Sequence, residues 1–229
     1  MDTITLTDAN FLSILQLGSP GLPVGAYSYS EGLELLVENG TISHQASLKH
    51  WLQAELQYGA IRLDGAVMVR AEKSARIGDR SALCRWNMWL SAARETEELR
   101  ACSWQMGRSL AQLLGKLQPQ IMPLVDAVND PCNYAIAFGI AVAHGQINIK
   151  AALLAYVHSW ATNLITAGVK LIPLGQTAGQ NLLWELQPLI SAVVEEMLAL
   201  EDDELRCCSW GLSLASMQHE TQHTRLFRS

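Results

Sequence analysis

The stretch that decides the fold is residues 148–169, which reads NIKAALLAYVHSWATNLITAGV. Its large apolar residues recur at intervals of three and four, so that they share one face of an α-helix. These residues are Ile149, Leu153, Tyr156, Val157, Trp160, Leu164 and Ile165. Such spacing does not fit a β-strand, whose side chains alternate with a period of two. The stretch therefore predicts a long amphipathic helix.

The same helical spacing recurs on both sides of this stretch. After Gly179 the apolar residues again repeat at intervals of three and four, with a predicted kink at Pro188. Residues 96–117 repeat in the same way before a proline ends the pattern. Shorter helices are predicted after four residues with N-cap side chains, namely Asp8, Ser30, Ser43 and Asp79. No alternating run competes, so the sequence predicts an all-α, single-domain bundle of roughly ten helices.

The composition narrows the classes of partner. Hydrophobic residues make up 49% of the 229 residues and charged residues 17%, which excludes global disorder and indicates buried interfaces between chains. The formal net charge is -6. Because binding to a phosphate backbone or an anionic membrane needs a basic surface, we expect no nucleic-acid partner and no membrane partner.

The cysteines and the N-terminus predict a cytoplasmic protein. The five cysteines contain no CxxC pair, and an odd number does not fit a disulfide framework. The N-terminus lacks the basic and apolar regions of a signal peptide, and no apolar run is long enough for a membrane-spanning helix. The adjacent Cys207 and Cys208 would suit redox chemistry or a soft metal, but we favour the interpretation that they pack as small hydrophobic residues.

Three stretches break the helical pattern. Residues 18–25 read GSPGLPVG and residues 171–175 read LIPLG, and both are predicted to be ordered turns between helices. Residues 201–206 read EDDELR and interrupt the apolar pattern before a weakly amphipathic segment, residues 210–222. We therefore predict a helical core over residues 1–201 and a C-terminal partner-binding tail over residues 202–229, ordered only by its partner.

The most specific short motif is HETQH, residues 219–223, which satisfies the HExxH pattern of zinc hydrolases. In such enzymes His219 and His223 would bind zinc while Glu220 acts as the base. A catalytic zinc needs a third protein ligand, and none follows in residues 224–229. The alternative interpretation is the polar face of a terminal helix.

The remaining polar residues favour no catalytic site. The charged run of residues 94–100, RETEELR, is interpreted as a solvated helix face with local ion pairs. The other histidines lack ligand spacing, and no GxxxxGK[ST] phosphate loop occurs, so we expect neither a metal site nor nucleotide hydrolysis.

Four longer stretches together resemble one known family. Residues 17–34, LGSPGLPVGAYSYSEGLE, resemble the signature SPxLPVGxFSYSxGLE of the UreF family of urease accessory proteins. Residues 94–110 resemble its RETxELR and MGxSL elements, residues 167–177 its AxxKLIPLGQ segment, and residues 219–229 its HExQYSRLFRS terminus. The matches follow the order of the family and cover almost the whole chain.

The chain departs from the family pattern at three positions. His223 stands where the family usually has tyrosine, so the second histidine of HExxH is a local substitution. Thr224 replaces the usual serine, and Glu31 stands where many members have histidine or glutamine.

The resemblance implies an all-α homodimer that is not an enzyme and holds no cofactor. Such a protein binds the UreD accessory protein, also called UreH, and together they recruit the GTPase UreG to apo-urease for nickel insertion. It implies that Lys170 engages the GTPase and that the tail residues contact the UreD-type partner. The full set of implied partner-binding residues is Tyr27, Ser28, Tyr29, Lys170, Pro173, Gly175, Gln176, Arg225, Leu226, Phe227 and Arg228.

Overall fold

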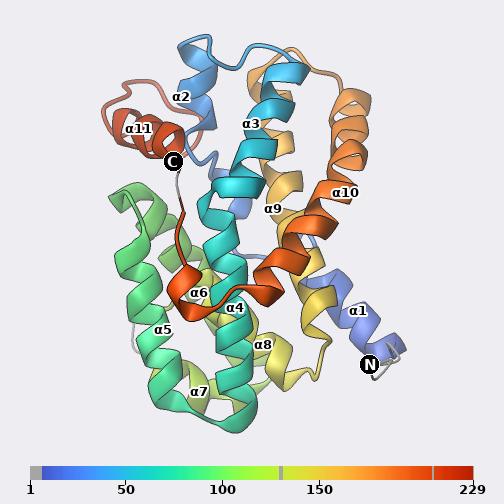
Figure 1. Cartoon of the computed structure of the whole chain (residues 1–229), viewed down its shortest axis with the longest axis vertical. Coiled ribbons are helices and arrows are strands. Elements are labelled where there is room, and N and C mark those ends of the chain that lie inside the picture. The colour runs from blue at the N-terminus through green and yellow to red at the C-terminus, as the bar shows by residue number, and fades with distance from the viewer. Residues whose placement is uncertain (1–6, 129–130, 208, 229) are drawn as a thin grey trace.

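The structure is a computed structural model that describes residues 7–128, 131–207 and 209–228. These ranges form eleven α-helices and three short 3-10 helices, with no strand among them, so the predicted all-α fold is confirmed (Figure 1). The α-helices are α1 Asp8–Leu17, α2 Leu33–Glu38, α3 Gln45–Tyr58, α4 Ala60–Ile77, α5 Arg80–Ala93, α6 Glu97–Leu117, α7 Met122–Ala127, α8 Tyr134–His144, α9 Ile149–Leu171, α10 Gln176–Ala199 and α11 Trp210–His219. The 3-10 helices are η1 Ala26–Ser28, η2 Pro119–Ile121 and η3 Asp202–Glu204.

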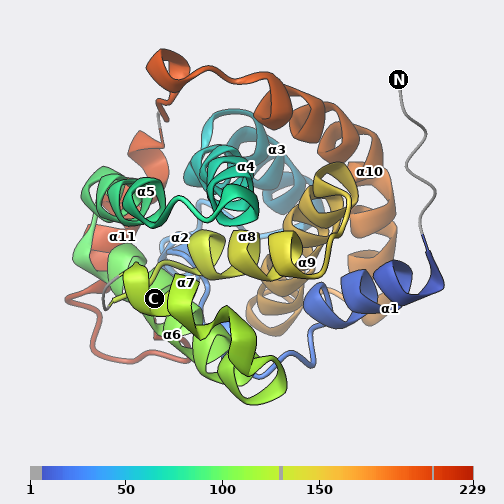
Figure 2. The ribbon, with the colours of Figure 1, turned by 90° about the horizontal axis from the view of Figure 1, so that it is seen from below.

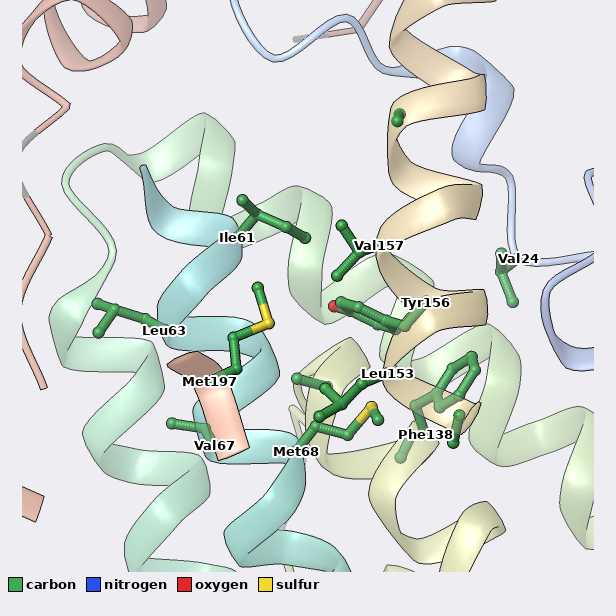
Figure 3. Close-up of a cluster of buried hydrophobic side chains, with 14 of the residues drawn as sticks. Val24, Ile61, Leu63, Val67, Met68, Phe138, Leu153, Tyr156, Val157 and Met197 are labelled. Atoms are coloured by element: carbon green, nitrogen blue, oxygen red, sulfur yellow. The ribbon is translucent and has the colours of Figure 1, made fainter. Parts of the chain in front are cut away.

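The core is built around α4 and α8, which lie at the centre of the bundle when it is viewed from below (Figure 2). Side chains of Met68, Phe138, Leu153 and Tyr156 converge between α4, α8 and α9 (Figure 3). The two central helices approach closely at Gly139, where an added Cβ would lie 2.8 Å from the carbonyl oxygen of Met68. Because real Cβ atoms do not come this close to backbone, only glycine permits this packing.

The two longest helices, α9 and α10, pack against each other and are joined by the predicted turn around Pro173. The apolar face predicted for α9 is buried almost throughout, apart from the half-buried Ile149 and Trp160. Helix α10 starts before Gly179 and keeps Pro188 inside it. The long periodic segments are therefore the part of the sequence that predicts the fold best.

Several predicted helix starts are shifted. The helix predicted after Ser30 begins at Leu33, because Glu31 and Gly32 have φ angles of 51° and 80° in the left-handed region. The caps of α1 and α3 are Thr7 and His44, each one residue away from the predicted Asp8 and Ser43. The cap predicted at Asp79 is confirmed, because its side chain accepts a backbone hydrogen bond from Ala82.

Helices α1 and α11 lie at the periphery of the bundle. Helix α1 packs on α9 and has no buried residue, and it carries the exposed side chains of Phe11, Leu12 and Leu15. Helix α11 packs on α2 and α6 (Figure 1). No helix in the described part of the chain is both long and apolar enough to cross a membrane.

Candidate partner-binding surface

The end of α9 meets the C-terminal segment. Lys170 is an exposed residue in the last turn of α9, and its Nζ atom lies 5.6 Å from the centre of the Phe227 ring. A lysine ammonium at this distance over an aromatic face is attracted by the ring quadrupole. The Phe227 side chain is only 5% exposed, so packing holds the ring in place. Two residues far apart in the sequence therefore form one patch.

The loop before α2 adds a second part to this patch. The carbonyl oxygen of Ser28, the last residue of η1, accepts a hydrogen bond from the Arg228 N–H at 2.8 Å. The Nδ2 group of Asn163 on α9 donates to the carbonyl oxygen of Tyr29 at 3.2 Å. Burial raises the pKa of the Tyr29 phenol, and the Arg228 guanidinium partly opposes this shift. The loop, α9 and the C-terminal segment thus contact one another.

Glu34 holds the C-terminal segment by its backbone. This glutamate lies in the first turn of α2 and is buried. Its Oε1 atom accepts a hydrogen bond from the Leu226 N–H at 2.6 Å, and Oε2 accepts one from the Phe227 N–H at 2.9 Å. Hydrogen bonds to an ionised acceptor are roughly twice as strong as those between neutral groups. One carboxylate therefore fixes two successive peptide groups of the tail.

His219 and Arg225 complete this attachment. The imidazole of His219 is fully buried, with Nδ1 2.9 Å from Oε2 of Glu98 and Nε2 3.5 Å from Oε2 of Glu34. Nη1 of Arg225 donates to Oε1 of Glu98 at 2.9 Å. We call Glu34, Glu98, His219 and Arg225 the terminal clamp. It ties the end of α11 and the segment after it to α2 and α6.

A second polar cluster lies inside the helical core. Nη2 of Arg94 donates to Oδ1 of Asp64 at 2.5 Å and to Oγ of Ser103 at 3.3 Å. The hydroxyl of Ser103 donates to Oδ1 of Asn133, whose Nδ2 group donates to Oδ1 of Asn87. We call these five residues the interior cluster. The cluster joins the start of α8 and the end of α5 to the neighbouring helices α4 and α6, and its side chains have little exposure to solvent.

The Asp64–Arg94 ion pair is almost completely removed from solvent. Their side chains are only 12% and 9% exposed. Burial raises the pKa of Asp64 above its ordinary value, and Arg94 partly offsets that rise. Burial also disfavours the charged form of Arg94, but the contact with Asp64, together with Tyr156 and Glu31, outweighs burial and the pKa of Arg94 rises. Each side chain of the pair therefore stabilises the charged form of the other.

A cavity of about 140 Å³ adjoins this ion pair. Its lining extends from the exposed ring of Tyr27 to Asp64 and Arg94. Glu31 also lines it, and Oε2 of Glu31 accepts a hydrogen bond from Nε1 of Trp160 at 3.0 Å. Burial raises the pKa of the Glu31 carboxyl. Within the described residues no group of three His, Cys, Asp or Glu side chains has the geometry to hold a metal ion.

Comparisons with known proteins place the chain in a family. The model of the UreF family matches residues 42–187. The chain is 75% identical to the urease accessory protein UreF of Nostoc sp., with 100% of both chains covered. The chain belongs to the UreF family. A UreF of Microcystis aeruginosa is 54% identical over 98% of this chain and 100% of that protein. A UreF of Chromohalobacter salexigens is 40% identical over 94% of this chain and 93% of that protein.

The structure does not build the zinc site that HExxH would require in a UreF-family chain. Helix α11 ends at His219 and Glu220 is its C-cap, so His223 does not lie one helical turn further along the same helix. The imidazole of His219 is instead buried against two carboxylates, whereas His223 is exposed. The motif therefore serves the terminal clamp through its first histidine.

The interpretation of residues 94–100 as a solvated helix face is wrong for its key members. Arg94 is paired inside the core, and Glu98 contacts His219 and Arg225. Periodicity missed these contacts because their partners lie in distant parts of the sequence, in α4 and the tail. The run is a junction between the interior cluster and the terminal clamp.

Cys207 is held as a thiol. Its Sγ atom donates to Oε1 of Glu95 at 2.9 Å. Burial, followed by the Glu95 contact, raises its pKa to about 12. Because the thiolate is the reactive form, this raised pKa disfavours redox chemistry at Cys207 and agrees with the packing interpretation. Its neighbour Cys208 lies outside the described residues.

The structure brings together only some of the residues that the family resemblance implied. Ser28, Tyr29, Lys170, Phe227 and Arg228 share contacts, and Arg225 and Leu226 belong to the same tail through Glu98 and Glu34. Tyr27 and Leu226 present exposed side chains. The exposed residues Pro173, Gly175 and Gln176 follow Lys170 in the loop and at the start of α10.

Sequence reasoning missed Glu34, Glu98 and His219 as residues that position the tail. All three stand in stretches that resemble the family pattern, and His219 also begins the HETQH motif. No periodic pattern marks them, because each acts through contacts with residues far away in the sequence. What they share is an acidic or imidazole side chain at a largely buried position, where an apolar residue is usual.

Proposed function

We propose that this chain is an adaptor in urease maturation, which binds a UreD-type accessory protein and with it recruits the GTPase UreG to apo-urease. The observation that carries the proposal is the set of contacts that joins the loop at Ser28 and Tyr29, Lys170 at the end of α9, and the tail at Phe227 and Arg228. Adaptors act by binding different partners at once, so a surface shared by remote segments suits this role.

Within this proposal the tail faces the UreD-type partner. Residues 202–229 form the partner-binding tail, and the exposed Leu226 and Arg225 are its outward anchors. Arginine and large apolar side chains are typical of the residues that dominate binding energy in interfaces. The described part of the tail already packs on its own chain, and the partner would select this docked arrangement.

The Lys170 end of α9 is the proposed contact for the GTPase. Lys170, Pro173, Gly175 and Gln176 are exposed in and after the last turn of α9, and Tyr27 is 70% exposed in the loop before α2. A lysine at this position attracts an acidic partner surface and raises the rate of association. The chain acts in the cytoplasm as a homodimer, which its high apolar fraction supports, and nickel is cargo of the assembled complex.

Binding assays with two variants test whether the tail and Lys170 bind different partners. We expect the full chain to capture both the UreD-type protein and UreG from a purified mixture. A chain truncated after Thr224 is expected to lose the UreD-type partner, because it lacks the last segment of the tail. Lys170→Ala is expected to weaken UreG recruitment at least tenfold and to retain the UreD-type partner.

Lys116→Ala provides the matched control, because Lys116 is also an exposed lysine in the last turn of a long helix. Its binding to both partners is expected to equal that of the unchanged chain. Unaltered binding by the truncated chain and by Lys170→Ala would refute the proposed surface. Equal loss of both partners in Lys170→Ala, with lost helicity, would show that the lysine serves folding.

A further inference from the structure

The cavity beside the Asp64–Arg94 ion pair is enclosed mainly by the loop of residues 18–31 and by α4, α6 and α9. Apolar side chains from separate elements form much of its wall, and Figure 3 shows three of them, Val24, Ile61 and Tyr156. Because a protein cavity of about 150 Å³ accepts benzene, this volume of about 140 Å³ holds about six non-hydrogen atoms. The size therefore fits one small molecule.

Arg94 has a buried donor atom that no described residue satisfies. Its Nη2 group is paired with Asp64 and Ser103, but its Nε atom has no hydrogen-bond partner among the described residues. The Arg94 side chain is only 9% exposed and lines the cavity. A buried N–H without an acceptor costs free energy, so such groups in native proteins usually meet a partner. A molecule in the cavity with a suitable acceptor would supply one.

Glu31 adds a strained carboxyl group to the same cavity. Its φ angle of 51° lies in the left-handed region, which residues other than glycine rarely adopt. Strain of this kind persists only where other contacts hold the residue, and it is concentrated at functional sites. The indole of Trp160 takes one of about four acceptor positions of the carboxylate, which leaves others for a ligand. Arg94 and Glu31 are close enough that each affects the pKa of the other.

The charges around the cavity favour a neutral ligand. Asp64 and Arg94 already compensate each other. Burial raises the pKa of Glu31, which favours its uncharged form. An anion would therefore bring a buried charge without a counterion, and a cation would require the buried Glu31 to ionise. A neutral molecule avoids both costs.

We propose that this cavity is a binding site for a small neutral carboxamide with a short apolar body. The carboxamide is a neutral group that offers both a strong acceptor and N–H donors. Its carbonyl oxygen accepts a hydrogen bond from Nε of Arg94, and its NH2 group donates to the Glu31 carboxyl. Its apolar part packs against the wall that contains Val24 and Ile61. The site does not depend on the proposed function, because it belongs to the chain itself.

Titration of the purified full-length chain with isobutyramide tests the site, because this amide has the required size and polarity. Two-dimensional NMR follows the Nε1–H group of Trp160, which donates to Glu31. We expect a saturable shift with a dissociation constant on the order of 1 mM, which is a realistic affinity for so small a ligand. Trp51 is the internal control, because it is not one of the described residues that line the cavity. No saturable shift at Trp160 up to about 100 mM would overturn the site.

Two analogues of the same branched shape test the choice of a neutral ligand. Isobutyrate is an anion at neutral pH, and isobutylamine is a cation. We expect each to bind roughly tenfold more weakly than isobutyramide, because each brings a charge into the cavity. Binding of either analogue with equal or higher affinity would overturn the assignment to a neutral amide.

Glu31→Gly tests the polar contact. Glycine adopts a φ of 51° more readily than glutamate does, so this variant should remain folded, which circular dichroism checks. Its affinity for isobutyramide should fall about tenfold, because the acceptor for the NH2 group is gone. An unchanged affinity in the folded variant would overturn the proposed role of the carboxyl group.

Ser159→Leu tests the space itself. Ser159 is a half-buried residue of α9 that lines the cavity, and a leucine there would occupy part of the volume. Binding of isobutyramide should then be lost while circular dichroism shows a folded chain. Ser109→Leu is the matched control, because Ser109 is a half-buried serine of α6 and is not one of the described residues that line the cavity. Equal affinity in the two leucine variants would overturn the location of the site.

Discussion

Arg94 and Glu98 lie close together in the sequence, yet they serve two different parts of the molecule. Arg94 belongs to the interior cluster and pairs with Asp64 among the core helices. Glu98 belongs to the terminal clamp and holds His219 and Arg225 of the C-terminal region. Both clusters use charged side chains, but the first joins elements that cannot separate without global unfolding. The second joins one end of the chain to a completed core.

This difference predicts how far the loss of one side chain spreads. A buried charge that loses its partner has no access to water, so the whole folded state is destabilised. A clamp on a terminal segment can open locally while the core stays folded. Substitutions in the interior cluster should therefore lower the free energy of unfolding. Substitutions in the terminal clamp should mainly change local opening of the C-terminal segment.

The largest effect is expected for Arg94→Met. This change leaves the Asp64 carboxyl buried without its guanidinium partner, which costs about 3–5 kcal/mol in the free energy of unfolding. Urea denaturation followed by circular dichroism measures the loss. The double variant Arg94→Met, Asp64→Asn should recover most of it, because no unpaired charge remains. A loss below about 1 kcal/mol in the single variant would show that the pair is not a central element of the core.

The next effect concerns the pH dependence of stability. Burial is the main cause that raises the pKa of Glu55 from 4.5 to about 7, although its hydrogen bond from Ser209 acts in the opposite direction. The folded state then binds a proton that the unfolded state releases. The resulting stability is fully present below pH 4.5 and is lost as the pH rises through about 7.

Glu55→Gln should remove this part of the pH dependence, which amounts to about 3 kcal/mol between the two limits. Urea denaturation at pH values from 4.5 to 8 gives the profile for each chain. The control is Glu185→Gln, because Glu185 forms an exposed ion pair with Lys49. Parallel profiles for Glu55→Gln and the unchanged chain would contradict the proposed protonation of Glu55.

A smaller and local effect is expected for Arg225→Gln. The Arg225–Glu98 pair is partly exposed, so its loss should lower the free energy of unfolding by less than about 1 kcal/mol. Digestion by a carboxypeptidase should nevertheless proceed faster, because the turn after α11 opens more often. Arg206→Gln changes an exposed arginine before α11 and should leave the digestion rate unchanged. A loss of global stability like that of Arg94→Met would remove the distinction between the clusters.

The same contrast explains how much of the molecule the sequence could predict. The helices α6, α9 and α10 follow from apolar periodicity, because each buries one face against the core. Helices α4 and α8 were not predicted, because α8 is buried nearly all round and α4 over most of its surface, which weakens the periodic signal. A continuous apolar run does not distinguish a buried helix from a buried strand.

The candidate surface was predicted by resemblance and not by pattern. Lys170 and Phe227 each stand in a stretch with a family motif, but nothing in their spacing shows that they touch. Glu34 and His219 are brought together by the chain path of α2 and α11. Long-range contacts of this kind depend on tertiary packing, so a single sequence does not specify them.

The smallest effect on stability is expected for Lys170→Ala. The lysine is exposed, and a cation–π contact at an exposed site contributes about 0.5–1 kcal/mol, so thermal unfolding should shift by only a few degrees. The expected loss in UreG recruitment, at least tenfold or about 1.4 kcal/mol, exceeds this change in stability. Lys170→Met retains the apolar stem but not the charge, and it should reproduce the recruitment defect. Normal recruitment by Lys170→Met would show that the effect of Lys170→Ala comes from lost packing on Phe227. Lys170 would then act by supporting the structure of the tail and not by its charge.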